Sequence, residues 1–126
     1  MKPIISESVY RTLYNLIIKQ KTPEVKQLGE ELTKALVVKD NALQKDIVTI
    51  NSVVEFIDDS VNKPIKFQIV LPEETNLSQR KISILAPISI ALIGFKQGAQ
   101  FAWKMPAGLK NINILSSSEH VQVVLR

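Results

Sequence analysis

The spacing of the apolar residues changes near residue 45, and this change restricts the fold more than any other feature of the 126-residue chain. Before this point the apolar residues recur three or four positions apart, which places them on one face of a helix. After it, apolar and polar residues alternate, which is the pattern of a half-buried strand. The sequence therefore predicts an α+β fold, with a short helical part at residues 1–45 and a sheet domain at residues 46–126.

Two helices are predicted before the change. The first runs from about Glu7 to about Gln20, with Ser6 as its N-cap. The second begins at a turn in which Thr22 supplies a capping hydroxyl and Pro23 lacks the N–H that would be unpaired there. Helices joined by so short a turn form an antiparallel hairpin, each arm about 20 Å long at 1.5 Å per residue. The apolar stripe of the second helix is expected to be Val25, Leu28, Leu32 and Leu36.

The sheet domain is predicted from a series of alternating segments. Residues 46–58 and 63–72 are expected to pair as an antiparallel hairpin. A third strand is expected at residues 81–85 and a fourth at residues 98–106, while residues 109–126 supply one or two more. We therefore expect a predominantly antiparallel sheet packed on one short helix.

That short helix lies in the apolar stretch between the third and fourth strands. Pro87 disfavours a helical conformation at Ala86 and fits the first turn of a helix that ends at Gly94. The residues expected to be buried on this helix are Ile88, Ala91 and Leu92.

Composition leaves few residues from which a catalytic or metal site could be built. The chain has no cysteine, which excludes disulfides and thiolate metal ligands. Its one histidine, His120, lies in a polar segment near the C-terminus and is expected to face solvent. We therefore predict no metal site, no histidine-based catalytic triad and no cofactor.

The charge is spread along the chain. Residues 1–45 hold eight basic and five acidic side chains, and residues 46–126 hold eight and seven. Without a dense basic cluster, contact with DNA is expected to be indirect at most. The longest apolar stretch, Ile84–Phe95, is interrupted by Pro87 and Ser89 and is too short to span a bilayer. Because the N-terminus also lacks the apolar segment of a signal peptide, we expect a soluble cytoplasmic protein without a membrane partner.

Several short motifs occur in an order that resembles the Gre family. The sheet domain resembles the C-terminal domain of the Gre transcript-cleavage factors, and more closely that of their short-armed Rnk (regulator of nucleoside diphosphate kinase) relatives. The resemblance covers residues 46 to about 115 and the helical part in outline. It implies an FKBP-like domain behind a helical hairpin. The residues that carry it are Val48–Ser52, Ile82 and Ser83, Pro87 and Ile88, Ala91–Gly94, and Gly98.

The resemblance implies that the chain binds RNA polymerase at the rim of its secondary channel, where the β′ subunit supplies a coiled-coil element. We expect the chain to be a monomer. In the family, the turn that enters the short helix makes this contact. Carried over by motif, the partner-binding residues are Ala86, Pro87, Ile88 and Ser89. Ser89 departs from the glycine or alanine that many relatives have at this point.

The tip of the hairpin argues against transcript cleavage. Cleaving Gre factors have a longer coiled coil whose tip carries closely spaced acids that help to hold a magnesium ion. Here the tip has Lys19, Lys21 and a single acid, Glu24. A hard divalent cation needs several converging carboxylate oxygens, which one glutamate does not supply. We therefore predict a regulator that is not itself an enzyme and that occupies the channel entrance.

Each of these residues also has a structural interpretation. Pro87 fits a helix start, and Glu24 fits a first-turn carboxylate facing the positive end of a helix dipole. Lys19 and Lys21 fit a solvated basic face. Trp103 fits the core better than the floor of a ligand pocket.

Two alternative functions remain open at this stage. A prolyl isomerase or chaperone of the FKBP fold would need an open apolar pocket lined by aromatic residues, for which the sequence offers few candidates. A helical-hairpin interaction module would need no polymerase partner.

Overall fold

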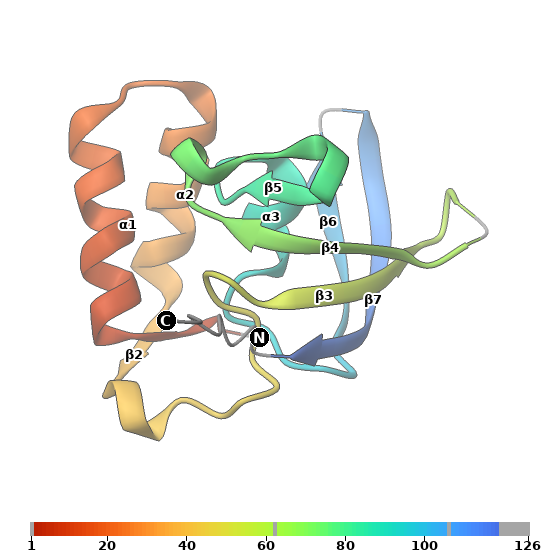
Figure 1. The fold of residues 1–126 in the computed structure, drawn as a ribbon, viewed down its shortest axis with the longest axis horizontal. Coiled ribbons are helices and arrows are strands. Elements are labelled where there is room, and N and C mark those ends of the chain that lie inside the picture. The colour runs from red at the N-terminus through yellow and green to blue at the C-terminus, as the bar shows by residue number, and fades with distance from the viewer. Residues whose placement is uncertain (1, 62, 106, 119–126) are drawn as a thin grey trace, which may run out of the picture.

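The computed structural model describes residues 2–61, 63–105 and 107–118. Two helices, α1 (Glu7–Lys19) and α2 (Pro23–Lys34), form an antiparallel hairpin beside the sheet (Figure 1). The side chain of Ser6 caps α1 and that of Thr22 caps α2, each accepting a backbone N–H three residues further on. The predicted hairpin and both predicted caps are therefore confirmed.

The end of α2 was predicted wrongly. Leu36 was expected in the apolar stripe of the helix, but it lies in β2 (Leu36–Val38) and is 54% exposed. The chain leaves the helix at Ala35, which has extended backbone angles, and the N–H of Leu36 donates to the carbonyl of Pro3 at 2.8 Å. Strand β2 pairs in parallel with β1 (Ile4–Ser6), forming a small sheet that the sequence pattern did not indicate.

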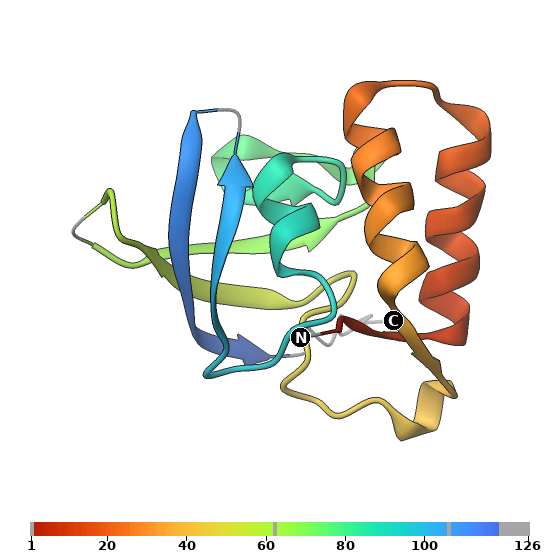
Figure 2. The same cartoon turned by 180° about the vertical axis from the view of Figure 1, so that it is seen from behind.

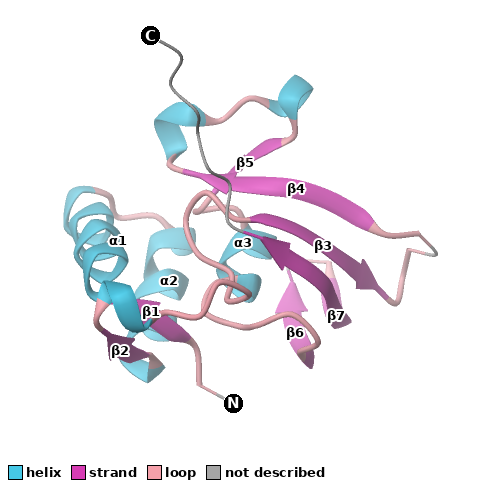
Figure 3. Ribbon diagram, turned by 60° about the horizontal axis from the view of Figure 1, so that its bottom comes forward, coloured by secondary structure: helices cyan, strands magenta, loops and turns pink. Residues whose placement is uncertain are grey.

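The main sheet has five strands in the order β5-β4-β3-β7-β6 (Figure 3). All neighbouring pairs are antiparallel except β4 and β5, which are parallel, so the expected predominantly antiparallel sheet is confirmed. The C-terminal region forms one long strand as far as Ser118, and residues 119–126, which include His120, lie outside the described residues. The bounds are β3 (Val53–Asp58), β4 (Ile65–Val70), β5 (Lys81–Ser83), β6 (Gln100–Met105) and β7 (Gly108–Ser118).

The first strand of the sheet is shorter than its alternating sequence suggests. The residues just before Val53 form a turn in which Asn51 has a φ of 74°, a left-handed value that asparagine tolerates. The N–H of Asn51 donates to the carbonyl of Ile69, and the Ser52 hydroxyl accepts the N–H of Thr49. The turn thus stays bonded to β4 through Asn51, while the Ser52 hydroxyl holds the turn itself together.

Helix α3 (Pro87–Leu92) packs on one face of the sheet (Figure 2). Ala91 and Leu92 are fully buried, as expected, but Ile90 is buried where Ile88 was expected to be. Ile88 is only half-buried. The helix was predicted to end at Gly94; it ends at Leu92, and Gly94 follows two residues later with a left-handed φ of 87°.

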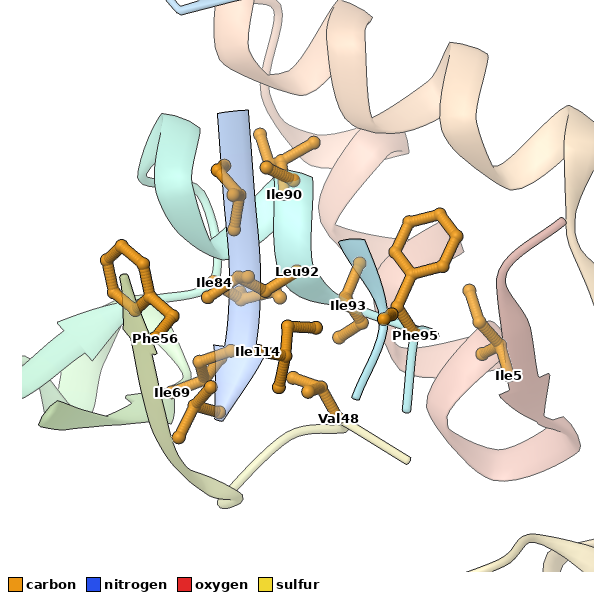
Figure 4. Packing of buried hydrophobic residues seen from close by; sticks show 14 of the residues in the cluster. Ile5, Val48, Phe56, Ile69, Ile84, Ile90, Leu92, Ile93, Phe95 and Ile114 are labelled. Carbon is orange, nitrogen blue, oxygen red and sulfur yellow. The ribbon is translucent and has the colours of Figure 1, made fainter. Parts of the chain in front are cut away.

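The helices and the sheet share one hydrophobic core (Figure 4). Leu13, Leu28 and Leu32 of the hairpin belong to the same buried cluster as Ile69 and Ile114 of the sheet. Residues on both sides of the predicted boundary at residue 45 thus pack together. The boundary itself stays a prediction. Among the residues that the structure describes, no helix is long and apolar enough to cross a membrane.

Candidate partner-binding site

An open pocket of about 390 Å³ lies where α3 meets the sheet. Its lining comes from β3, β4, β5, β6, α3 and the short helix η3 (Leu77–Gln79). Elements that are far apart in sequence therefore build one concave surface. The lining residues are Phe56, Asp58, Ile65, Lys66, Phe67, Leu77, Arg80, Ile82, Ile88 and Met105.

Apolar side chains form the walls of this pocket. Phe56 and Phe67, on neighbouring strands, meet edge to face with their ring centroids 5.8 Å apart and their planes at 86°. Both rings are almost fully buried, whereas Leu77 at the mouth is 73% exposed. The apolar pocket and the exposed leucine beside it together form an apolar surface that is open to a partner.

Charged side chains stand among the apolar ones. Asp58, Lys66 and Arg80 all line the pocket, so both signs of charge are present. Arg80 has a left-handed φ of 55°, and its carbonyl accepts the N–H of Gln68 at 2.9 Å, which ties the loop after η3 to β4. The pocket is thus lined mostly by apolar side chains and also offers charges of both signs to a partner.

The structure exposes only some of the four predicted partner-binding residues. Ala86, Pro87 and Ile88 are half-buried, and Ile88 forms part of the pocket wall. Ser89 has no exposed surface, and its hydroxyl has no hydrogen-bond partner among the described residues. Its side chain therefore does not belong to a surface that a partner could touch, although the other three residues do.

The sequence interpretation missed most of the pocket. Phe56 and Phe67 were not singled out, because alternation along β3 and β4 indicates which side chains face inward but not that a pocket opens beside them. Trp103 is half-buried, packs against the core and does not line the pocket, as its structural interpretation predicted. Leu77 and Arg80 lie between the strands predicted at residues 63–72 and 81–85, where no periodic signal pointed to them.

The tip of the hairpin is a separate surface. Lys19, Lys21 and Glu24 are all exposed. The bend between α1 and α2 lies at the end of the hairpin opposite to β2 (Figure 1). Within the described residues, no group of three or more histidine, cysteine, aspartate or glutamate side chains is arranged to hold a metal ion.

Comparison with known proteins identifies the family. Residues 43–118 match the family model described as transcription elongation factor, GreA/GreB, C-term. Transcription elongation factor GreA of Thermodesulfovibrio yellowstonii is 32% identical over 94 residues, which are 75% of this chain and 60% of that protein. The regulator of nucleoside diphosphate kinase of Escherichia coli K12 is 30% identical over 87 residues, 69% of this chain and 64% of that protein.

A solved structure resembles nearly the whole chain. It is a prokaryotic transcription elongation factor GreA/GreB from Nitrosomonas europaea, with 32% identity and a TM-score of 0.75 over 94% of this chain and 98% of that one. The match to GreA itself spans only 60% of the length of that relative. The expected resemblance is confirmed by the family match, and the chain belongs to the GreA/GreB family of transcription elongation factors.

Proposed function

We propose that this protein binds RNA polymerase at the rim of the secondary channel and regulates transcription there without stimulating transcript cleavage. Its sheet domain acts as an FKBP-like docking unit, and the β′ subunit supplies the contact. The observation that carries the proposal is that Ile88, which lies in the segment matched by the family model, is also a wall of the open apolar pocket.

The docking surface consists of the pocket together with the turn at Ala86 and Pro87, which enters α3. Ala86 and Pro87 lead into α3 and fix the position of Ile88, because the proline ring restricts the backbone at the first turn of the helix. Leu77 lies on the same pocket and is largely exposed. A partner that inserts an apolar side chain here removes both residues from water, which favours binding.

The proposed absence of transcript cleavage rests on the length of the hairpin and on the residues at its tip. Each arm is about 20 Å long, and its tip offers one carboxylate between lysines, so it does not deliver a metal ion to a distant catalytic centre. A short, lysine-tipped hairpin instead occupies space at the channel entrance. The protein then competes with longer-armed factors for the same rim.

Binding to core RNA polymerase tests the docking surface. Ile88→Asp and Leu77→Asp each replace an apolar contact by a charge and should weaken capture of the polymerase at least tenfold, since the partner would remove the new carboxylate from water. Leu109→Asp is the matched control, because Leu109 is 71% exposed and does not line the pocket. Pro87→Ala should give a smaller loss.

The outcome that contradicts the docking surface is specific. If Ile88→Asp and Leu77→Asp retain the structure of the unmodified protein by circular dichroism and bind polymerase as tightly as Leu109→Asp, the pocket is not the interface.

A stalled elongation complex tests the absence of cleavage. Addition of this protein should leave the transcript length unchanged, whereas a cleaving GreA factor added in parallel should shorten it. Transcript shortening that depends on this protein would overturn this part of the proposal.

The prolyl isomerase alternative has one feature in its favour, which is the open pocket with two phenylalanines in its wall. Against it, the relatives reported above are named as elongation factors or as a regulator, and none is named an isomerase. Turnover of a proline-containing peptide at a rate abolished by Ile88→Asp would revive this alternative.

A further inference from the structure

We infer that strand β1 and Gly94 lock the helical hairpin onto the sheet domain, so that Pro3 and Gly94 are the residues that set the direction of the hairpin relative to the pocket. The lock is argued from contacts within this chain. Only its consequence for polymerase binding rests on the proposed function.

Strand β1 is bonded to both parts of the molecule through adjacent residues. The carbonyl of Pro3 accepts the N–H of Leu36, the first residue after the hairpin in β2, at 2.8 Å. The N–H of Ile4 donates to the carbonyl of Gly94, in the turn after α3, at 2.9 Å. The backbone at residues 3 and 4 therefore bridges the hairpin and the sheet domain directly.

Gly94 is fitted to this bridge in two ways. Its φ of 87° is left-handed, which favours glycine. A Cβ at this position would lie 2.4 Å from the Cβ of Pro3 and 2.9 Å from the backbone N of Ile4. Its own N–H donates to the carbonyl of Val48 at 2.8 Å, which holds the turn on the sheet domain. Any side chain at this position has to push β1 away.

Strand β1 continues into α1 without an intervening loop. Strand β1 ends at Ser6, which is also the N-cap of α1, and Ile5 is 3% exposed and belongs to the core. The carboxylate of Asp40 accepts the N–H of Ser8 at 3.0 Å, which ties the segment after β2 to the start of α1. A displacement of β1 is therefore transmitted to both helices.

The consequence is a hairpin that moves with the docking pocket as one unit. A partner bound in the pocket meets the lysine-bearing tip in one orientation. Loosening the lock should leave the docking surface intact and let the tip sample other directions.

The absence of cysteine from the sequence allows a clean distance measurement. Lys21→Cys at the tip and Lys104→Cys on β6 are both at exposed positions and accept spin labels. Double electron–electron resonance on this doubly labelled chain should give a single narrow distance distribution.

Two glycine substitutions then separate the lock from backbone strain. Gly94→Ala combines a left-handed alanine with the clash against Pro3. Gly98→Ala is the matched control, because Gly98 has a φ of 90° and nothing lies within 4 Å of an added Cβ. Gly94→Ala should broaden or shift the distribution, and Gly98→Ala should leave it unchanged.

A second variant covers the case in which Gly94→Ala does not fold. Leu36→Pro removes the N–H that Pro3 accepts, at an exposed position preceded by extended backbone, and should broaden the distribution in the same way. The inference is contradicted if either variant folds and still gives the narrow distance distribution of the parent chain. These distances are measured without polymerase, so a failure of the docking proposal leaves this result unaffected.

Discussion

Asp59 accepts two hydrogen bonds from Asn111, one from the side-chain amide at 2.7 Å and one from the backbone N–H at 3.2 Å. The pair joins the residue that follows β3 to β7 at an exposed position. These bonds, the side-chain bond foremost, hold the pKa of Asp59 below its ordinary value of 3.8.

The pH dependence of stability follows from this pKa. A lowered carboxyl pKa in the folded state stabilises the protein above the unfolded pKa, and this contribution disappears as the pH falls through the folded value. Asp59→Asn should therefore lower the urea midpoint at neutral pH and leave it nearly unchanged below the folded pKa of Asp59. Urea titrations at a series of pH values check this. A difference between the two proteins that stays constant across the series would contradict the linkage.

Ser89→Ala should stabilise the protein. The Ser89 hydroxyl is buried without a partner among the described residues, and an unpaired buried polar group is unfavourable by about 1–3 kcal/mol. Ser83→Ala is the contrasting variant, because the Ser83 hydroxyl accepts the N–H of Leu85 at 3.0 Å and its loss should destabilise by about 0.5–1.5 kcal/mol. Chemical denaturation of both variants measures the two signs, and equal signs would refute the argument.

Gly29→Ala should also stabilise the protein, in contrast to alanine at Gly94. Gly29 lies within α2, and an added Cβ would meet the Cδ1 of Ile17 at an ordinary contact distance of 3.8 Å. Alanine is favoured over glycine inside a helix by about 1 kcal/mol. The measurement is the free energy of unfolding in urea; a destabilised Gly29→Ala would show that the hairpin packs more tightly than described.

Phe67→Ala should destabilise the protein strongly without being informative about binding. Phe67 is 5% exposed and packs edge to face on Phe56, and truncating a buried phenylalanine typically destabilises by about 3–5 kcal/mol. Leu77→Ala, at the mouth of the same pocket, should change stability by no more than about 0.5 kcal/mol. Thermal unfolding separates the two, and similar losses of Tm would mean that the mouth of the pocket is part of the core.

The sequence predicted the elements whose local pattern is strong. The helix caps at Ser6 and Thr22 and the helix start at Pro87 depend on chemistry within a few residues, and each was found where expected. The order of the alternating segments was enough to predict a mostly antiparallel sheet beside a hairpin.

The features that were missed depend on contacts between distant residues. Leu36 leaves the helix because Pro3, more than thirty positions earlier, accepts its N–H. The parallel pairing of β4 with β5, and the pocket that Leu77 and Ile88 share, likewise arise only when the chain has folded. Hydrophobic periodicity carries no information about such pairings.

The burial pattern of the helical hairpin shows where its length can change without disturbing the core. Leu13 and Leu28 are fully buried in the core, while the residues from Lys19 to Pro23 are exposed and form the bend, in which Thr22 caps α2. Extra helical turns spliced in at that bend would lengthen the reach and leave the anchored base untouched. A hairpin of another length is thus compatible with the same buried foundation.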